Sequence, residues 1–419
     1  VAWAEALHGD DLRPQHDAPP PPGWQPVARQ RPAAQPDPLP VPTLRHLAYR
    51  RTWRREAPGL RRVRPATSAV QIFDATGLAA VERASGRLQW QRLGLRPAPG
   101  RALSFALDDD ERLHALDAAG RSRWFAEAVW GDAAAHDIRR HGDRVVVMTT
   151  ERDVIGLDAA DGRPRWRHAI HYGTVVGTAA HGPMLWLTGE DGFLHGLDVT
   201  DGRPRFVVRL PGDAEGGPQL VPGGMLVGTN REPDRASMLT LHDPLSGRAR
   251  WSRPLDGALL GAPLCTDDRT VALLDDGLQA HVVLLDLATG KICWRRPLDD
   301  ADDAPQAQLL DGAICLKSTA GDLTVLEIED GALRWSLPGD DPDRALRVNA
   351  PMVSARGLWL LPSTRIRAID PRSGRVVHAL DCGDLVPDWM HVWPEGDLII
   401  AEDDAVACYL LAGHLAVVS

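Results

Sequence analysis

The sequence predicts an all-β chain that closes into a propeller of four-stranded antiparallel blades, and three observations lead to this prediction. One glycine-centred hairpin motif occurs eight times, at intervals of 34 to 45 residues. The aromatic residues include 14 Trp against 3 Tyr and 5 Phe, which indicates one repeated structural role for tryptophan. The 39 Gly and 34 Pro favour many turns over long helices.

Each copy of the motif reads as two strands joined by a tight turn. In LDAADGRPRW (157–166), the aspartate side chains can bond turn amides and Gly162 can take a positive φ at no steric cost. An earlier apolar run such as RVVVMTT (144–150) precedes each copy, and one further innermost strand completes a four-stranded blade. The eight motif glycines are Gly86, Gly120, Gly162, Gly202, Gly247, Gly290, Gly331 and Gly374.

Tryptophan follows most of these glycines in the outer strand, where it can wedge between adjacent blades and bury a large flat surface. Phe206 takes this position in one copy and His378 in another, so we expect weaker contacts at those two blade interfaces. Trp186 and Trp359 lie within apolar runs instead, and we expect both in the core.

The pattern LD-x-x-(D/S/T)-G-(R/K)-x-x-W resembles the tryptophan-docking repeat of PQQ-like propellers over roughly residues 50 to 412. That superfamily includes quinoprotein alcohol dehydrogenases and the outer-membrane assembly lipoprotein BamB. A dehydrogenase of this kind would need PQQ, a calcium ion and a catalytic Asp, and no calcium-ligand set can be matched onto this sequence. The resemblance therefore implies the fold, and we expect neither enzymatic activity nor a cofactor.

The ring is expected to close by pairing strands from the two ends of the chain, which removes exposed sheet edges. GDLIIAEDDAVACYLL (396–411) lacks a following glycine hairpin, and YRRTWRREAPG (49–59) looks like an orphan outer strand bearing Trp53. A literal count of motifs gives nine blades, whereas the family commonly has eight and the first interval is short. We favour eight, with seven or nine open.

Two regions of unequal character divide the chain. Residues 1–44 contain the run Pro19-Pro20-Pro21-Pro22 and predict a Pro-rich linker or tail, largely without regular secondary structure. Residues 45–419 form the predicted propeller. The sequence begins at Val1, so we expect an upstream domain or subunit that is missing from this chain.

Known chemical motifs do not occur: the sequence contains no phosphate-binding loop, no nucleophile elbow, no HExxH and no haem-attachment CxxCH. His168 and His171 lie close together in RHAIHY, but no further metal ligands can be identified beside them. We therefore predict no catalytic, cofactor-binding or metal-binding residues.

The two ends of the blades differ in charge. Blade-to-blade connections and turns between second and third strands share one end, and they carry most acidic clusters, including Asp191 and Asp276. The glycine turns at the other end carry arginines, so we predict an acidic face that attracts a partner with a basic surface. Aromatic and apolar anchors in the acidic connections complete the predicted contact set, which is Trp130, Trp389, Met390, Trp393, Asp299, Asp300, Asp302 and Asp303.

These features favour a non-catalytic protein-interaction scaffold, as a module of a larger bacterial protein or complex. Two alternatives stay open: a periplasmic, BamB-like envelope-assembly scaffold, and a quinoprotein-like enzyme or sensor that uses the central funnel. The net charge of −10 argues against nucleic-acid binding, and no apolar run is long enough to insert into a membrane. Five scattered cysteines do not form a disulfide framework, so we expect a cytoplasmic protein, with the periplasm as the alternative.

Overall fold

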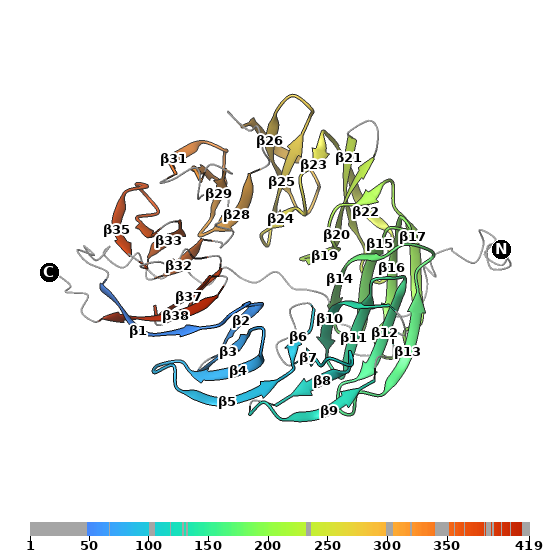
Figure 1. Cartoon of the computed structure of the whole chain (residues 1–419). Helices are drawn as coiled ribbons and strands as arrows, with labels where there is room; N and C mark the ends of the chain where they lie inside the picture. Colours follow the sequence, from blue (N-terminus) through green and yellow to red (C-terminus); the bar gives the residue numbers. More distant parts are fainter. Residues whose placement is uncertain are drawn as a thin grey trace.

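The computed structural model describes residues 48–412, with short gaps at 67, 100–104, 118, 128–129, 131–132, 232–235, 299–304, 319–320, 340–351, 356, 364, 381, 383–386, 388, 395 and 403. Within this part, the chain forms nine antiparallel sheets arranged around a common centre (Figure 1). The predicted propeller is therefore confirmed. Its nine blades match the literal count of motifs rather than the eight that the family's usual number favoured. The predicted Pro-rich segment, residues 1–44, lies outside the described residues.

Blades 1 to 4 each contain four strands that run in chain order from the centre outward (Figure 1). Blade 1 consists of β2 (Arg62–Pro65), β3 (Ala69–Phe73), β4 (Gly77–Glu82) and β5 (Leu88–Leu93). Blade 2 consists of β6 (Arg96–Pro97), β7 (Phe105–Leu107), β8 (Leu113–Leu116) and β9 (Ser122–Ala126). Blade 3 consists of β10 (Ala135–His141), β11 (Arg144–Thr149), β12 (Asp153–Asp158) and β13 (Pro164–Ala169). Blade 4 consists of β14 (Val175–His181), β15 (Met184–Gly189), β16 (Phe193–Asp198) and β17 (Pro204–Arg209).

In blades 5 and 6 the innermost strand is split into two short segments that pair with the same neighbour. Blade 5 consists of β18 (Asp213–Ala214), β19 (Gln219–Val221), β20 (Gly224–Arg231), β21 (Ala236–His242) and β22 (Ala249–Asp256). Blade 6 consists of β23 (Ala258–Leu259), β24 (Leu264–Cys265), β25 (Arg269–Asp275), β26 (Ala280–Asp286) and β27 (Ile292–Pro297). Blade 7 consists of β28 (Gln306–Leu310), β29 (Ala313–Lys317), β30 (Leu323–Glu327) and β31 (Leu333–Leu337). Blade 8 consists of β32 (Val353–Ala355), β33 (Leu358–Pro362), β34 (Ile366–Ile369) and β35 (Val376–Leu380).

The ninth sheet, called the closing blade here, combines both ends of the described chain. Its strands are β36 (Trp389–Val392), β37 (Leu398–Glu402), β38 (Ala405–Ala412) and the outermost β1 (Ala48–Glu56). β1 pairs with β38 in antiparallel register, from Tyr49 opposite Leu411 to Glu56 opposite Ala405 (Figure 1). The predicted closure by terminal strands is confirmed, and it gives β38 a partner strand on its outer side.

Blade 2 is the short unit that led the sequence analysis to favour eight blades over nine. Its strand β7 spans only Phe105–Leu107, and β6 has two residues, which accounts for the short first interval between motifs. All three residues of β7 are nevertheless buried, so this short unit forms a complete blade rather than a degenerate one.

Middle strands are buried on both faces because every blade is packed between two others. In β15 all six residues are buried, and in β11 only Arg144 is not. Outer strands such as β9 alternate between exposed and buried positions instead. This layering explains why the sequence shows continuous apolar runs followed by alternating segments.

The glycine hairpins have one conformation throughout. All eight motif glycines have φ between 66° and 74°, the left-handed region in which a side chain is strained. Each glycine also contacts the aromatic ring of the preceding blade: a Cβ on Gly162 would lie 2.4 Å from Trp124 Cε3. The indole Nε1 of Trp124 then donates to Ala159 O at 2.9 Å, three residues before that glycine. The same donor geometry occurs for Trp53, Trp166, Trp251, Trp294 and Trp335.

Two interfaces depart from this scheme. Phe206 packs on Gly247 but has no N–H, and the missing donor comes from Trp186, whose Nε1 donates to Pro244 O at 2.8 Å. His378 faces the closing blade, where the chain ends take the place of a glycine hairpin. Trp186 and Trp359 are fully buried, as predicted.

Candidate functional site

The antiparallel order of the strands divides the ring into two faces. Blade-to-blade connections and the turns between second and third strands lie at one end, called the connection face. The glycine hairpins and the turns between first and second strands lie at the other end, called the Gly-turn face.

The predicted contact residues have unequal positions. Trp130, Met390 and Trp393 are buried within this chain, with 3–5% of their surface exposed. Trp389 is half-buried. Asp299, Asp300, Asp302 and Asp303 lie outside the described residues. Partner contact by this set stays a prediction, and Trp389 is the aromatic member that retains exposure.

β36 explains the burial of the tryptophan-rich segment. Because successive side chains of a strand point to opposite faces, Met390 packs into the core shared with blade 8, whereas Trp393 packs into the core shared with blade 1. Trp393 Nε1 donates to Ala66 O at 3.1 Å. The segment that resembled an exposed loop is therefore the innermost strand of the closing blade, packed on both sides.

Arg83 joins blade 1 to the closing blade, and sequence analysis did not identify it. Its guanidinium lies 4.4 Å from the ring centroid of Trp393 and forms an ion pair with Asp397. Its carbonyl also accepts the indole N–H of Trp53 at 2.7 Å. Arg83 thus contacts Trp53 near one end of the described chain and Trp393 and Asp397 near the other.

Several acids of the connection face are internal partners rather than surface charges. Asp108 contacts His114 Nε2 at 2.9 Å, Asp191 contacts His195 Nε2 at 2.9 Å, and Asp276 contacts His281 Nε2 at 2.7 Å. Backbone N–H groups of Gln279 and Leu278, together with the His281 imidazole, lower the pKa of Asp276 to about 2.

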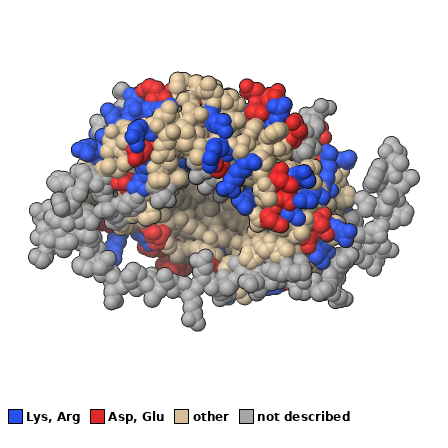
Figure 2. Space-filling model, turned by 90° about the horizontal axis from the view of Figure 1, so that it is seen from below, with Lys and Arg blue, Asp and Glu red and all other residues tan. Residues whose placement is uncertain are grey.

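Asp191 is buried, with 4% of its surface exposed. Burial acts to raise the pKa of Asp191, but hydrogen bonds from His195 and from backbone N–H groups outweigh it and leave that pKa below its usual range. Asp191 therefore stays ionised, but its burial leaves that carboxylate unavailable to a partner at the surface. On the side seen in Figure 2, acidic and basic side chains are interspersed, and neither sign covers a continuous area.

The connection face also exposes large apolar side chains. Leu278, in the turn between β25 and β26, is 94% exposed; Leu93, at the end of β5, is 74% exposed; and Tyr172, in the connection between β13 and β14, is 62% exposed. These three side chains stand singly in different parts of the ring and form no continuous patch, so their exposure alone does not identify a contact surface. Sequence analysis missed them because each stands alone between polar residues.

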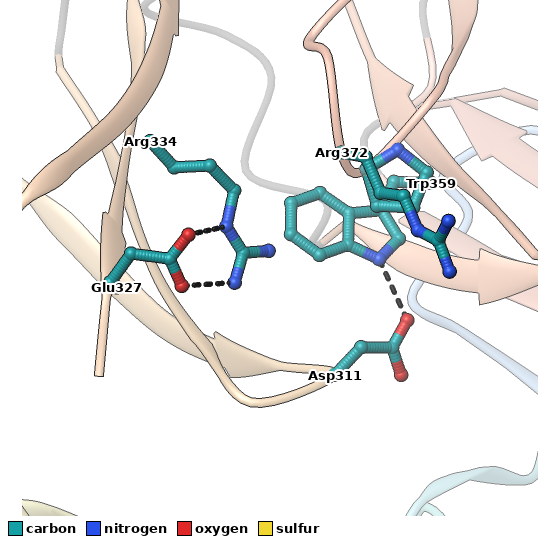
Figure 3. A pocket seen from close by; sticks show the side chains of 6 residues that line it. Asp311, Glu327, Arg334, Trp359 and Arg372 are labelled. Carbon is teal, nitrogen blue, oxygen red and sulfur yellow. Dashed lines mark hydrogen bonds and ion pairs between the residues drawn. The ribbon is translucent and has the colours of Figure 1, made fainter. Parts of the chain in front are cut away.

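A pocket of about 380 Å³ opens on the Gly-turn face between blades 7 and 8 (Figure 3). Arg334 Nε and Nη2 donate to the two carboxylate oxygens of Glu327, at 2.7 and 2.5 Å. On the opposite wall, Trp359 Nε1 donates to Asp311 Oδ2 at 2.7 Å. Figure 3 shows the Trp359 indole between Arg334 and Arg372.

The ion pair in this pocket keeps both of its partners charged. The hydrogen bonds from Arg334 lower the pKa of Glu327, and those same bonds raise the pKa of Arg334. A carboxylate held in a bidentate pair stays ionised and is a poor general acid near neutral pH. A related pocket of about 250 Å³, lined by Asp117, Arg123 and Arg140, lies between blades 2 and 3. Pockets with ionic linings thus occur at these two blade junctions.

The family and its relatives agree with this architecture. The family model described as "Outer membrane protein assembly factor BamB" matches residues 74–206 and 213–410. The curated BamB of Bordetella pertussis is 36% identical over 138 residues, which is 32% of this chain and 34% of that protein. The aligned stretch thus spans about a third of that relative's length.

Two solved structures share the fold. BamB from Moraxella catarrhalis superposes with a TM-score of 0.51 at 18% identity, over 88% of this chain and 99% of that one. The computationally designed Ika8 protein superposes with a TM-score of 0.50 at 13% identity, over 84% and 96% respectively. At these identities, the two structures support the propeller fold alone.

The expected cytoplasmic location is wrong, because the family matched is that of an outer membrane assembly factor. Cysteine usage misled the prediction for a physical reason. Cys315, Cys382 and Cys408 are buried core residues, and burial raises the pKa of the Cys315 thiol to about 12. Such thiols act as small apolar side chains and carry little information about the redox state of the compartment. Among the described residues, no helix is long and apolar enough to cross a membrane.

The family model matches well over half of the chain, and the matched residues include strands of all nine blades. The repeated hairpins, the contacts between tryptophan and glycine, and the strand order are all present in the same region. The chain therefore belongs to the family described as outer membrane protein assembly factor BamB.

Proposed function

We propose that this chain is a non-catalytic scaffold that assists the assembly of outer membrane proteins and acts in the periplasm. The match of the BamB family model to residues 74–206 and 213–410 carries this proposal. The bidentate ion pair between Glu327 and Arg334 supports the non-catalytic part, because a carboxylate held in this way stays ionised and is a poor general acid.

The connection face is the proposed contact surface for a protein partner. Leu93, Tyr172 and Leu278 present exposed apolar groups there, in blade 1, after blade 3 and in blade 6. Contacts spread around a ring suit a broad partner surface rather than a small ligand. The partner with a basic surface that the sequence predicted would add electrostatic attraction to these apolar contacts.

A deletion and complementation experiment in the native host tests this function. Loss of the chain is expected to reduce the amount of folded outer membrane β-barrel proteins, measured by their heat-modifiable mobility in gels. Wild-type chain restores the level, and the triple variant Leu93→Ser, Tyr172→Ser, Leu278→Ser does not. Unchanged β-barrel levels after deletion would contradict the proposal.

A matched control is available at the opposite ends of the outer strands. Leu88, Ile292 and Leu333 are also exposed, by 39–50%, but they lie two residues after the motif glycines, at the Gly-turn face. Their combined replacement by Ser removes apolar surface of similar size. This control should complement fully; equal failure of both triples would show a general loss of stability instead of a contact face.

A further inference from the structure

Folding brings together a group of metal-ligating side chains on the connection face. His171 lies in the connection after β13, Asp191 in the turn between β15 and β16, and His195 in β16. One nitrogen or oxygen atom of each lies within 4.8 Å of the others. In the sequence His171 had only His168 beside it, and the fold supplies Asp191 and His195 from the next blade.

The distances are close to those of a metal site. Asp191 Oδ2 lies 2.9 Å from His195 Nε2 and 3.2 Å from His171 Nδ1. Zinc binds histidine nitrogen and carboxylate oxygen at about 2.0–2.2 Å, so the ligand atoms of a tetrahedral site are about 3.3 Å apart. Two of the three separations are therefore near that value, and the third, between the two histidine nitrogens, is within 4.8 Å. Binding of an ion also requires loss of the protons now shared with the carboxylate.

Two ligands are held rigidly and one can adjust. The side chains of Asp191 and His195 are 0% and 1% exposed, whereas that of His171 is 28% exposed. Backbone N–H groups of His171 and Phe193 also donate to the Asp191 carboxylate, at 3.0 and 3.1 Å. The buried pair thus forms a fixed base, and His171 can close over an ion from the solvent side.

Comparison with other blades separates this cluster from an ordinary turn. Contacts of the same kind join Asp108 to His114 in blade 2 and Asp276 to His281 in blade 6, so an Asp–His pair alone is a repeated device of the turn. In the part of the chain that the structure describes, only the blade 4 pair gains the third ligand required for a metal group. The addition of His171 is therefore the distinctive feature.

The surroundings leave ring nitrogens without hydrogen-bond partners. Among the described residues, His195 Nδ1 and His168 Nε2 are buried and have no partner. The rings of His168 and His195 lie 5.5 Å apart, edge to face. A histidine that ligates a metal through Nε2 carries its proton on Nδ1, and a neighbouring imidazole nitrogen is a suitable acceptor.

We propose that His171, Asp191 and His195 bind a divalent ion of the Zn²⁺ class and thereby link blade 3 to blade 4 at the connection face. Two imidazoles and one carboxylate favour Zn²⁺ over Ca²⁺ or Mg²⁺, which prefer oxygen ligands. Three protein ligands leave a fourth position for water or for a side chain of a partner. The inference is independent of the proposed function.

The test uses untagged full-length chain, freed of metal by a chelator and then titrated with Co²⁺ and Zn²⁺. We expect one Co²⁺ per chain, with the visible absorption bands of tetrahedral coordination, and displacement of Co²⁺ by Zn²⁺. His171→Ala should weaken Zn²⁺ binding at least about tenfold. Because His171→Ala also removes the contact with Asp191 Oδ2, the melting temperature of this variant without metal is the baseline against which its response to Zn²⁺ is measured.

His114→Ala is the matched control, because it disrupts a similar Asp–His pair that has no third ligand. At a Zn²⁺ concentration near the wild-type dissociation constant, the metal should raise the melting temperature of the wild type and of His114→Ala, and clearly less that of His171→Ala. Absence of saturable binding at one site per chain, or equal binding by His171→Ala and the wild type, would overturn the proposal.

Discussion

The interface after blade 4 and the interface after blade 8 both lack the motif tryptophan, and they lack it for different reasons. After blade 4, Phe206 still packs on Gly247, and Trp186 supplies the indole hydrogen bond from another strand. After blade 8, His378 meets a blade whose outer turn is replaced by the chain ends. After blade 4, another tryptophan thus replaces the hydrogen bond of the missing motif residue. After blade 8, the motif residue is missing because the ring closes there.

The contact after blade 8 depends on apolar packing instead. Ile366 and Leu380 of blade 8 lie in the same core cluster as Leu398, Ile400 and Tyr409 of the closing blade. Tyr409 Oη also donates to Cys382 O, at 3.5 Å. From the sequence, we expected the same weakening at Phe206 and at His378. The structure shows a different arrangement at each of these two positions.

The largest expected effect is the difference in stability between replacing a motif tryptophan and replacing the histidine at the equivalent position of blade 8. Trp335→Ala removes the ring that packs on Gly374 and the donor to Pro371 O, and it should lower the free energy of unfolding by about 3–5 kcal/mol. His378→Ala removes a half-buried side chain that has no glycine hairpin to pack on, and should cost less than about 1 kcal/mol. Chemical denaturation of both variants measures the difference, and equal losses would contradict the comparison.

A smaller effect is expected from the glycine side of the same interface. A Cβ on Gly374 would lie 2.6 Å from Trp335 Cδ2, and φ is +69°. Gly374→Ala should therefore cost about 2–4 kcal/mol from backbone strain and overpacking together. Gly142→Ala has a similar φ of +58° but no atom within 4 Å, and should show the strain alone, about 1–2 kcal/mol. If the two variants lose the same amount of stability, the contact with the Trp335 ring is not what requires glycine at position 374.

The compensation by Trp186 can be tested with a double-mutant cycle. Trp186→Phe leaves Pro244 O without its indole donor and should cost about 1–3 kcal/mol. Phe206→Trp alone should bring no gain, because that carbonyl is already occupied. Combining both changes should restore part of the loss, and strictly additive free energies would show that Trp186 does not replace the motif tryptophan.

The smallest expected effect is a local pH dependence in the closing blade. Burial and the nearby positive charge of Arg83 lower the pKa of His391 below its usual 6.5. As the pH falls below 6.5, the unfolded chain therefore binds more protons at His391 than the folded chain does. The contribution of neutral His391 to the free energy of unfolding is complete above pH 6.5, and it is lost as the pH falls through the lowered pKa of the folded state. The hydrogen-exchange protection factors of β36, corrected for the intrinsic exchange rate at each pH, should fall on acidification, and His391→Gln should remove most of this fall.

Local patterns predicted most of the fold, since each glycine hairpin is specified by residues a few positions apart. The short blade 2 was harder to count, because a strand as brief as Phe105–Leu107 gives almost no periodic signal. The alternation in Trp389–Val392 does signal a strand, but its flanking prolines and acids resembled a loop. Contacts such as Arg83 with Trp393, or His171 with Asp191, depend on how blades stack around the ring, and sequence spacing carries no record of that stacking.

Pairing of β1 with β38 also has a consequence for the order in which the molecule is made. β1 begins at residue 48, and its partner does not exist until about residue 405 has been synthesised or exported. Until then Trp53 lacks the half of its core cluster that the closing blade provides, and β1 remains without its partner strand. A chaperone that shields this segment until the last strand arrives would be most useful at that stage.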